Sequence, residues 1–265
     1  MISVFYRIQK KALGQNFLIN KHIAEIEAAH AMEKNVLELG PGIGVLTKEL
    51  CKVANRVVAV EIDPLLYNNL KHSIDADNLK LINKDFFKAT SDELELNSID
   101  IMIANIPYKL SSKVVEFLSS NNLQAVLCLQ KEFVEHMLAK PGTRKYSRLS
   151  VTSQLSFNMT KITGVPKGNF RPVPKVDSII IYMKPKSKLS EKDARLITLI
   201  MQHKKKTLRN AIEEAAKNMG IGKEKAKEMA ESIAGTMQNE RAFKLNPEEL
   251  LEIARQISRE TNQKE

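Results

Sequence analysis

Residues 105–108 (NIPY) combine hydrogen-bond acceptors with an aromatic ring at the end of a predicted strand. The Asn105 side-chain oxygen and the Pro107 carbonyl can both accept, and proline stiffens the loop without adding a donor. Tyr108 can stack on an extruded base. The exocyclic amine of adenine is a poor nucleophile, so fixed acceptors that hold its hydrogens and stabilise the developing cation would promote methyl transfer to it. These residues predict an adenine-amine methylation site; the alternative is a turn with a buried tyrosine.

Small and acidic residues follow three other predicted strands. Gly40 and Gly42 belong to the turn GPGIG, where small residues let a ligand approach the carboxyl edge of a sheet. Glu61, about twenty residues further on, can accept hydrogen bonds from ribose hydroxyls. Asp85 can accept from the exocyclic amine of a cofactor adenine. Together they predict a nucleotide-like cofactor, although an NAD-dependent enzyme would show the glycines and Glu61 equally well.

Residues 168–176 (GNFRPVPKV) form the other unusual segment, because two prolines at alternate positions favour a stiff, extended loop. Phe170 is a candidate for a second stacking face opposite Tyr108. Arg171 and Lys175 are placed where they could reach phosphates. The structural alternative is a stiff connection that leads into the last strand of the sheet.

Apolar segments alternate with segments of helical spacing along the first part of the chain. The predicted strands cover residues 35–39, 57–61, 79–83, 100–104 and 125–129. Asp63 and Pro64 are a typical helix start. This alternation predicts an α/β fold with a doubly wound, parallel sheet. We expect two later β-rich segments, residues 149–156 and 178–183, to complete the sheet.

The composition changes near Lys184, where the segment KPKSKLSEKD is typical of a linker. Beyond it, the spacing predicts helices over residues 194–201, 208–219, 223–233 and 247–257. We therefore expect two domains, the larger over residues 1–184 and a small all-helical one over residues 185–265.

Basic residues are concentrated in two spans that contain no acid, in a chain whose formal net charge is +10. One span lies between His136 and Val176 and holds eight basic residues; the other, residues 194–212, holds five. Such spans fit a polyanion such as RNA, although a solvated basic face would have the same composition. The candidate RNA contacts are Arg144, Lys145, Arg148, Arg171, Lys175, Lys204, Lys205, Lys206 and Arg209.

The remaining composition argues against several other classes. No apolar run approaches the roughly 18 residues of a membrane span, and the first eleven residues reverse the charge order of a secretory signal. Cys51 and Cys128 lie in apolar settings typical of reduced thiols, and the histidines show no metal-ligand spacing. We expect a cytoplasmic protein with no membrane segment and no metal.

Taken together, these segments resemble the KsgA family of ribosomal RNA adenine dimethyltransferases. The resemblance spans nearly the whole chain. It rests on LGQNFL (13–18), LELGPGIGVLT (37–47), NIPY, YSRLSV (146–151), FRPVPKVDS (170–178) and KKKTLRN (204–210). The family tends to have arginines where this chain has the run of three lysines, which gives phosphate contacts of different geometry.

The resemblance implies a Rossmann-like class I methyltransferase sheet, S-adenosylmethionine as cofactor, and a small C-terminal helical domain that contributes to RNA binding. By position, the cofactor contacts correspond to Gln15, Asn16, Leu18, Gly40, Gly42, Glu61, Asp85 and Asn105. The target-amine site corresponds to Asn105, Pro107 and Tyr108, with Phe170 helping to hold the base.

The family transfers two methyls to each of two adjacent adenosines in a hairpin loop near the 3′ end of small-subunit rRNA. The implied partner is that RNA or a pre-ribosomal small subunit, and we expect a monomer. The closest alternative is an Erm-type enzyme acting on large-subunit rRNA, which shares the catalytic motifs. Others are a non-enzymatic rRNA-binding assembly or transcription factor, an NAD-dependent oxidoreductase and a DNA adenine methyltransferase.

Overall fold

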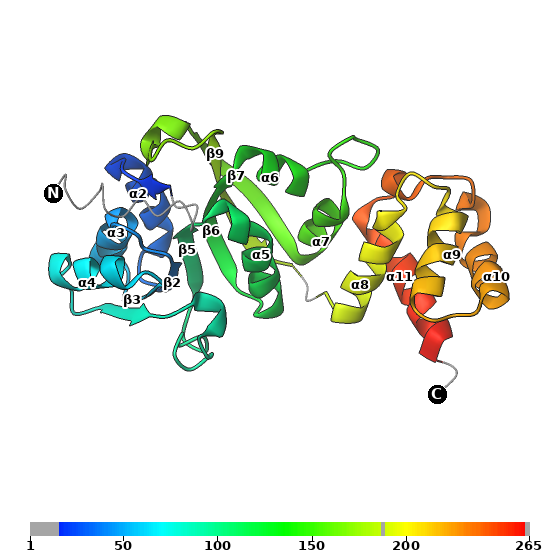
Figure 1. Cartoon of the computed structure of the whole chain (residues 1–265), viewed down its shortest axis with the longest axis horizontal. Helices are drawn as coiled ribbons and strands as arrows, with labels where there is room; N and C mark the ends of the chain where they lie inside the picture. The colour runs from blue at the N-terminus through cyan, green and yellow to red at the C-terminus, as the bar shows by residue number, and fades with distance from the viewer. Residues whose placement is uncertain (1–15, 187–188, 263–265) are drawn as a thin grey trace. The chain divides into compact units, whose positions relative to one another are not determined.

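The computed structural model describes residues 16–186 and 189–262, and these form two compact units. Within the described residues, the first unit comprises residues 16–133 and 159–184. The second comprises residues 134–158, 185–186 and 189–262. Figure 1 follows the chain through both units by colour.

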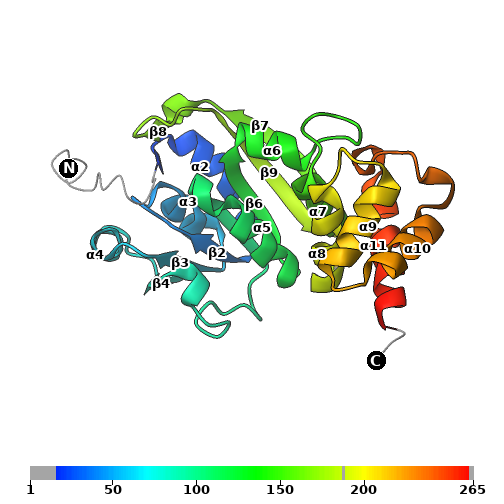
Figure 2. The same cartoon turned by 45° about the vertical axis from the view of Figure 1, so that its right-hand side comes forward.

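A seven-stranded sheet is the framework of the first unit, and its strands lie side by side in both views (Figures 1 and 2). Its order is β4-β3-β2-β5-β6-β9-β7. The five strands from β4 to β6 are paired in parallel, whereas β9 runs antiparallel to β6. The strands are β2 (Asn35–Leu39), β3 (Arg56–Glu61), β4 (Leu79–Asn83), β5 (Ile101–Asn105), β6 (Gln124–Gln130), β7 (Phe157–Val165) and β9 (Ser178–Pro185). The predicted α/β fold is confirmed.

Helices precede, connect and follow the parallel strands, as expected for a doubly wound sheet. They are α2 (Lys21–Ala28), α3 (Val45–Val53), α4 (Pro64–Ser73), α5 (Ser111–Ser120) and α6 (Lys131–Met137), with short 3-10 turns η2 (Ala29–Ala31), η3 (Phe86–Lys88), η4 (Tyr108–Leu110) and η5 (Lys167–Asn169). Asp63 caps α4 by accepting from the Leu65 N–H, at 2.8 Å, as the sequence predicted. The core between α2, α3 and the sheet includes Ala24, Leu46 and Leu50.

Two very short strands join distant parts of the first unit. β1 (Phe17–Leu18) pairs antiparallel with β8 (Phe170–Arg171), with Leu18 opposite Phe170. The Asn20 side chain also donates to the Asn169 side-chain oxygen at 2.7 Å. This pairing was not predicted, because neither strand is long enough to have a periodic pattern.

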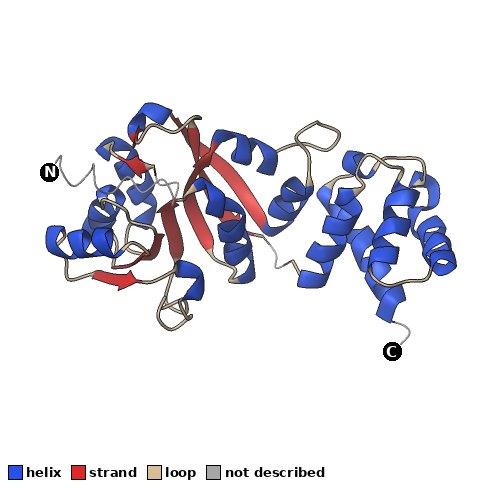
Figure 3. Ribbon diagram, in the orientation of Figure 1, coloured by secondary structure: helices blue, strands red, loops and turns tan. Residues whose placement is uncertain are grey.

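The second unit contains helices alone between residues 189 and 262 (Figure 3). They are α8 (Glu191–Gln202), α9 (Leu208–Asn218), α10 (Lys223–Ala234) and α11 (Pro247–Asn262), with η6 (Gly235–Met237) and η7 (Ala242–Lys244). Ser190 and Thr207 cap α8 and α9, and Asn246 accepts from the Glu249 N–H at the start of α11. All four predicted helices are present.

Residues 149–156 form part of a helix, α7 (Arg148–Ser156), so the prediction of a strand there was wrong. Ser147 and Ser150 make a capping box at its start. Val151 and Leu155, four residues apart, lie on one helical face and pack into the core of the helical unit. The strand that completes the sheet is β7, directly after this helix.

The domain boundary also differs from the predicted one. Lys184 ends the first unit as expected, but residues 134–158 pack with the helical unit instead of the sheet unit. Tyr146 explains part of this arrangement, because it is fully buried in the helical core and its hydroxyl donates to the Leu245 carbonyl at 2.9 Å. Among the described residues, no helix is long and apolar enough to cross a membrane.

The Tyr146 hydrogen bond can be tested by Tyr146→Phe. We expect a loss of about 1–3 kcal/mol in the free energy of unfolding, because the buried Leu245 carbonyl loses its donor. The measurement is thermal or urea unfolding followed by circular dichroism. Tyr182→Phe is the matched control; its hydroxyl donates to Gln124 at 2.8 Å in a half-buried setting, so we expect a smaller loss. Equal losses in the two variants would contradict this assignment.

Candidate active site

The order of strands reverses at β2, because β2 pairs with β3 on one side and with β5 on the other. Helices that leave such neighbouring strands in opposite directions open a crevice at the carboxyl ends of the strands. The glycine turn follows β2 and Asn105 ends β5, so both reach this crevice. The sheet topology therefore brings together two segments separated by sixty-five residues (Gly40 to Asn105) in the sequence.

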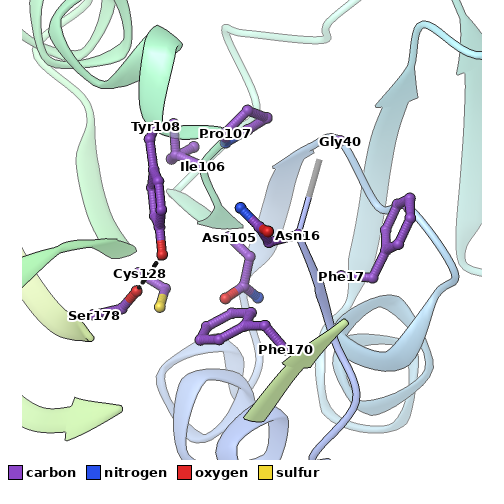
Figure 4. A pocket seen from close by; sticks show the side chains of 11 residues that line it. Asn16, Phe17, Gly40, Asn105, Ile106, Pro107, Tyr108, Cys128, Phe170 and Ser178 are labelled. Carbon is purple, nitrogen blue, oxygen red and sulfur yellow. Dashed lines mark hydrogen bonds between the residues drawn. The ribbon is translucent and has the colours of Figure 1, made fainter. Parts of the chain in front are cut away.

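A pocket lies at this position and is drawn in Figure 4. It brings together seven of the predicted site residues, from four separate segments of the chain. They are Asn16, Gly40, Gly42, Asn105, Pro107, Tyr108 and Phe170. An adjoining pocket is lined by Leu18 and Glu38 as well as by Asn16, the glycine turn and Asn105. Gln15 lies outside the described residues.

The Asn105 amide makes an asymmetric set of contacts. Its Nδ2 donates to Glu27 Oε2 at 3.0 Å. Its Oδ1 is buried and has no hydrogen-bond partner within the described part of the chain. A buried acceptor without a donor is costly, and such groups are found where a ligand or water supplies the donor. Asn105 lines the pocket and has a free acceptor oxygen, and its predicted role as an acceptor for an amine stays a prediction.

Pro107 and Tyr108 complete the NIPY segment. The Pro107 carbonyl already accepts from the Leu110 N–H at 2.8 Å, in the turn η4, so only its second lone pair is available to a ligand. The Tyr108 hydroxyl lies 3.1 Å from Ser178 Oγ, a contact drawn as a dashed line in Figure 4. Burial raises the pKa of Tyr108, so its hydroxyl stays protonated. The contact with Ser178 fixes the hydroxyl end of the ring.

The glycine turn is shaped for a ligand. Gly42 has a φ of +61°, and a Cβ at this position would lie 2.8 Å from Phe17 Cδ1. Its N–H donates to Glu61 Oε2 at 3.0 Å, while Glu61 Oε1 accepts from the Asp63 N–H at 2.9 Å. Glu61 thus ties the turn to the start of α4 while keeping unused lone pairs. The turn and the unpaired Asn105 oxygen fit a nucleotide-like cofactor with polar atoms.

Glu61 and Asp85 do not line either pocket, although both were predicted to contact the cofactor. Glu61 is only 1% exposed, and burial raises its pKa against the opposing effect of its backbone hydrogen bonds. Asp85 caps the turn η3 by accepting from the Phe87 N–H at 3.0 Å. Their roles as cofactor contacts remain predictions.

Two buried acids beside the site were not assigned roles from the sequence. Glu27, on α2, and Glu38, on β2, are 0% and 2% exposed. Burial raises the pKa of each to about 8. The local sequence does not mark Glu27 as a site residue, because an acid on a short helix is normally predicted to be exposed to solvent. Cys128 and Ser178 also line the pocket without having been predicted.

Several predicted RNA contacts are engaged within the protein. Lys204 donates to the Tyr146 carbonyl, and Lys145 pairs with Glu135. The remaining engaged residues contact acids or the loop backbone: Lys206 with Glu214 at 3.7 Å, Arg209 with Glu231 at 2.9 Å, and Arg171 with the Phe170 carbonyl at 2.8 Å. Such exposed pairs contribute little energy and exchange readily for phosphate contacts.

Arg144, Arg148, Lys175 and Lys205 are also exposed. For Arg144, Lys175 and Lys205, the described residues include no acid within ion-pair distance. The binding of RNA by all nine basic residues stays a prediction.

The sheet is that of a Rossmann-like methyltransferase, with a pocket at the carboxyl ends of its central strands. A family model described as "Ribosomal RNA adenine dimethylase" matches residues 7–258. The chain therefore belongs to the ribosomal RNA adenine dimethylase family, whose members use S-adenosylmethionine.

Individual relatives agree with this membership. The chain is 37% identical over 262 residues to the probable ribosomal RNA small subunit methyltransferase A of Thermococcus gammatolerans, covering 96% of this chain and 92% of the relative. The crystal structure of a dimethyladenosine transferase from Plasmodium falciparum superposes with a TM-score of 0.81 at 28% identity, covering 92% and 98%. The 23S rRNA methyltransferase ErmE has a TM-score of 0.58 at 23% identity, covering 92% and 100%, and shares the fold.

The raised pKa values of Glu27 and Glu38 predict that the protein loses stability as pH rises. The folded pKa of about 8 exceeds the ordinary value of 4.5, so the folded state holds protons that the unfolded state has released. The free energy of unfolding therefore falls between about pH 5 and pH 8.

Thermal melts across this range, without ligand, provide the measurement. The Glu27→Gln/Glu38→Gln double variant is the control. It removes both titrating groups and leaves the exposed basic residues unchanged. We expect a flatter pH dependence in the double variant. Parallel curves for the two proteins would show that the two acids do not titrate as described.

Proposed function

We propose that this protein methylates the N6 amine of adenosines in small-subunit ribosomal RNA, with Asn105 Oδ1 as the principal acceptor for that amine. The observation that carries the proposal is this buried oxygen, which lacks a donor at the switch point of the sheet. The names of the curated relatives support the small-subunit target.

The protein contributes orientation and charge stabilisation to the reaction. S-adenosylmethionine supplies an electrophilic methyl group on a sulfonium. Asn105 Oδ1 and the second lone pair of the Pro107 carbonyl accept the two amine hydrogens, which leaves the nitrogen lone pair free to face the methyl group. As the amine becomes cationic, the two acceptors stabilise it more strongly than they stabilise the neutral base. The methylated amine is itself acidic, so no strong general base is needed.

Two aromatic rings are proposed to hold the target base. Tyr108 and Phe170 both line the pocket (Figure 4), and they come from segments that are far apart in the sequence. The bond to Ser178 positions Tyr108, and the pairing of β8 with β1 positions Phe170. Stacking between two rings offsets the cost of extruding a base.

The proposed cofactor site consists of residues from the strand ends and from the segment before α2. They are Gln15, Asn16, Leu18, Gly40, Gly42, Glu61, Asp85 and Asn105. Support comes from the open approach at Gly40, where a Cβ would meet nothing within 4 Å, and from the positive φ of Gly42, which favours glycine. Asn16 and Leu18 line the adjoining pocket.

The finer target follows from the family resemblance: two adjacent adenosines near the 3′ end of the RNA, each receiving two methyls, in RNA or a pre-ribosomal particle. We propose a monomeric, cytoplasmic enzyme in which the helical unit contributes basic residues to RNA binding. A role in ribosome biogenesis would accompany the modification.

The experiment that tests the function is transfer of tritiated methyl from S-adenosylmethionine to unmethylated small and large ribosomal subunits in parallel reactions, with the product nucleoside identified by mass. N6,N6-dimethyladenosine in small-subunit RNA is the expected result. Label confined to large-subunit RNA would favour an Erm-type enzyme. Tight subunit binding without any label would favour a non-enzymatic assembly factor.

Asn105→Ala tests the acceptor role directly. We expect kcat to fall by about 100-fold or more, because the transition-state cation loses a fixed acceptor. RNA binding should change little. Asn69→Ala, on the exposed face of α4, is the control and should keep full activity. Turnover near the wild-type value in the Asn105 variant would exclude the acceptor role.

RNA affinity is expected to fall steeply with salt concentration, because the basic residues would displace counterions from phosphates. Arg144→Ala and Lys205→Ala should each lower the slope of log Kd against log salt by about one. Lys227→Ala, on the exposed side of α10 and outside both acid-free spans, is the control. Unchanged slopes in the first two variants would mean that these side chains do not touch phosphates.

A further inference from the structure

Glu27 occupies an unusual place for a carboxylate. It lies on α2 with 0% exposure, between Ala24 and Ala28, which belong to the apolar core beneath the sheet. One of its oxygens, Oε1, is buried and has no partner among the described residues. The other, Oε2, accepts from Asn105 Nδ2 at 3.0 Å.

This placement is costly for the fold. Burying a carboxylate with a single hydrogen bond costs several kcal/mol relative to an apolar side chain of the same size, or forces the group to take up a proton. The hydrogen bond from Asn105 lowers the pKa of Glu27, but by less than burial raises it. Burial raises the pKa of Glu27 to about 8. The stability of α2 therefore does not explain why an acid stands here.

The contact to Asn105 does supply an explanation. A primary amide has nearly the same shape when its oxygen and nitrogen are exchanged, so packing alone does not set its orientation. A carboxylate oxygen accepts only, and Glu27 therefore requires Nδ2 to face α2. The ionised carboxylate enforces this orientation, and a proton on Oε1 is compatible with it because Oε2 still accepts from Nδ2. In this arrangement Asn105 Oδ1 is buried without a partner among the described residues.

We propose that Glu27 is a positioning residue for methyl transfer, which fixes the Asn105 amide so that its oxygen, and not its nitrogen, faces the target amine. The inference rests on the acceptor role proposed above for Asn105. Without this contact, the amide can turn and present two donors to an amine that itself needs acceptors. Glu27 thus acts on the reaction without touching the substrate.

The test compares Glu27→Met with Glu27→Gln by single-turnover and steady-state methyl transfer to unmethylated small subunits. Methionine has a similar length but no strong acceptor, and we expect kcat to fall about 10-fold or more with KM for RNA nearly unchanged. Glutamine restores an acceptor oxygen without the charge, and should keep kcat within about threefold of the wild-type value. A purely structural role would change KM and the melting temperature together with kcat.

Glu49→Met is the matched control. Glu49 is a buried acid on the neighbouring helix α3, paired with Lys52 at 2.6 Å and without contact to Asn105, so kcat should not change. Wild-type kcat in Glu27→Met would overturn the proposal, and so would equal losses in the Met and Gln variants.

If Glu27→Met does not fold, Glu27→Asp is measured in its place. The aspartate side chain is one methylene shorter, so its carboxylate cannot reach Asn105 Nδ2. Wild-type kcat in Glu27→Asp would also overturn the proposal. Asn105→Ala, measured in the same assay, separates the two ideas. Normal turnover in Asn105→Ala would exclude the acceptor role of Asn105. Loss of turnover in Asn105→Ala together with normal turnover in Glu27→Met would exclude only the positioning role of Glu27.

Discussion

The parallel pairing of β2 with β5 is the constraint on which the site depends. Because β2 also pairs with β3, the strand order reverses between β2 and β5, and the chain segments that leave these two strands diverge. The glycine turn and Asn105 meet in the space that this divergence opens. The other elements of the site come to the same place: the turn η4 carries Tyr108, and the β1–β8 pair carries Phe170.

Buried carboxyl groups fix the positions of several site residues through hydrogen bonds. Glu61 holds the glycine turn through the Gly42 N–H, and Glu27 holds the Asn105 amide. Glu38 lines the adjoining pocket. Burial raises the pKa of all three, and a cationic ligand nearby would favour their ionised forms.

The helical unit shows that a family-like motif can serve structure as well as binding. Tyr146, in the YSRLSV segment, is buried, and its hydroxyl reaches Leu245. Lys204, in the basic KKKTLRN segment, donates to the Tyr146 carbonyl. These two segments therefore hold each other in place within one unit. The exposed neighbours Arg144 and Lys205 remain the better candidates for contacts to phosphate.

Local signals were sufficient for much of the fold. Hydrophobic periodicity and helix caps placed β2, β4, α9 and α10 within a residue of their observed ends, and the NIPY segment predicted an acceptor at Asn105. Three features depended on contacts between distant residues. Residues 149–156 form a helix because Val151 and Leu155 pack into a core that lies mostly far ahead in sequence. The two-residue strands β1 and β8 exist only as a pair, and Glu27 acquires its role only from an asparagine 78 residues away. The hydrophobic pattern of a segment indicates which of its side chains are buried. The three features above depend instead on contacts with residues that are distant in the sequence and become neighbours only in the folded chain.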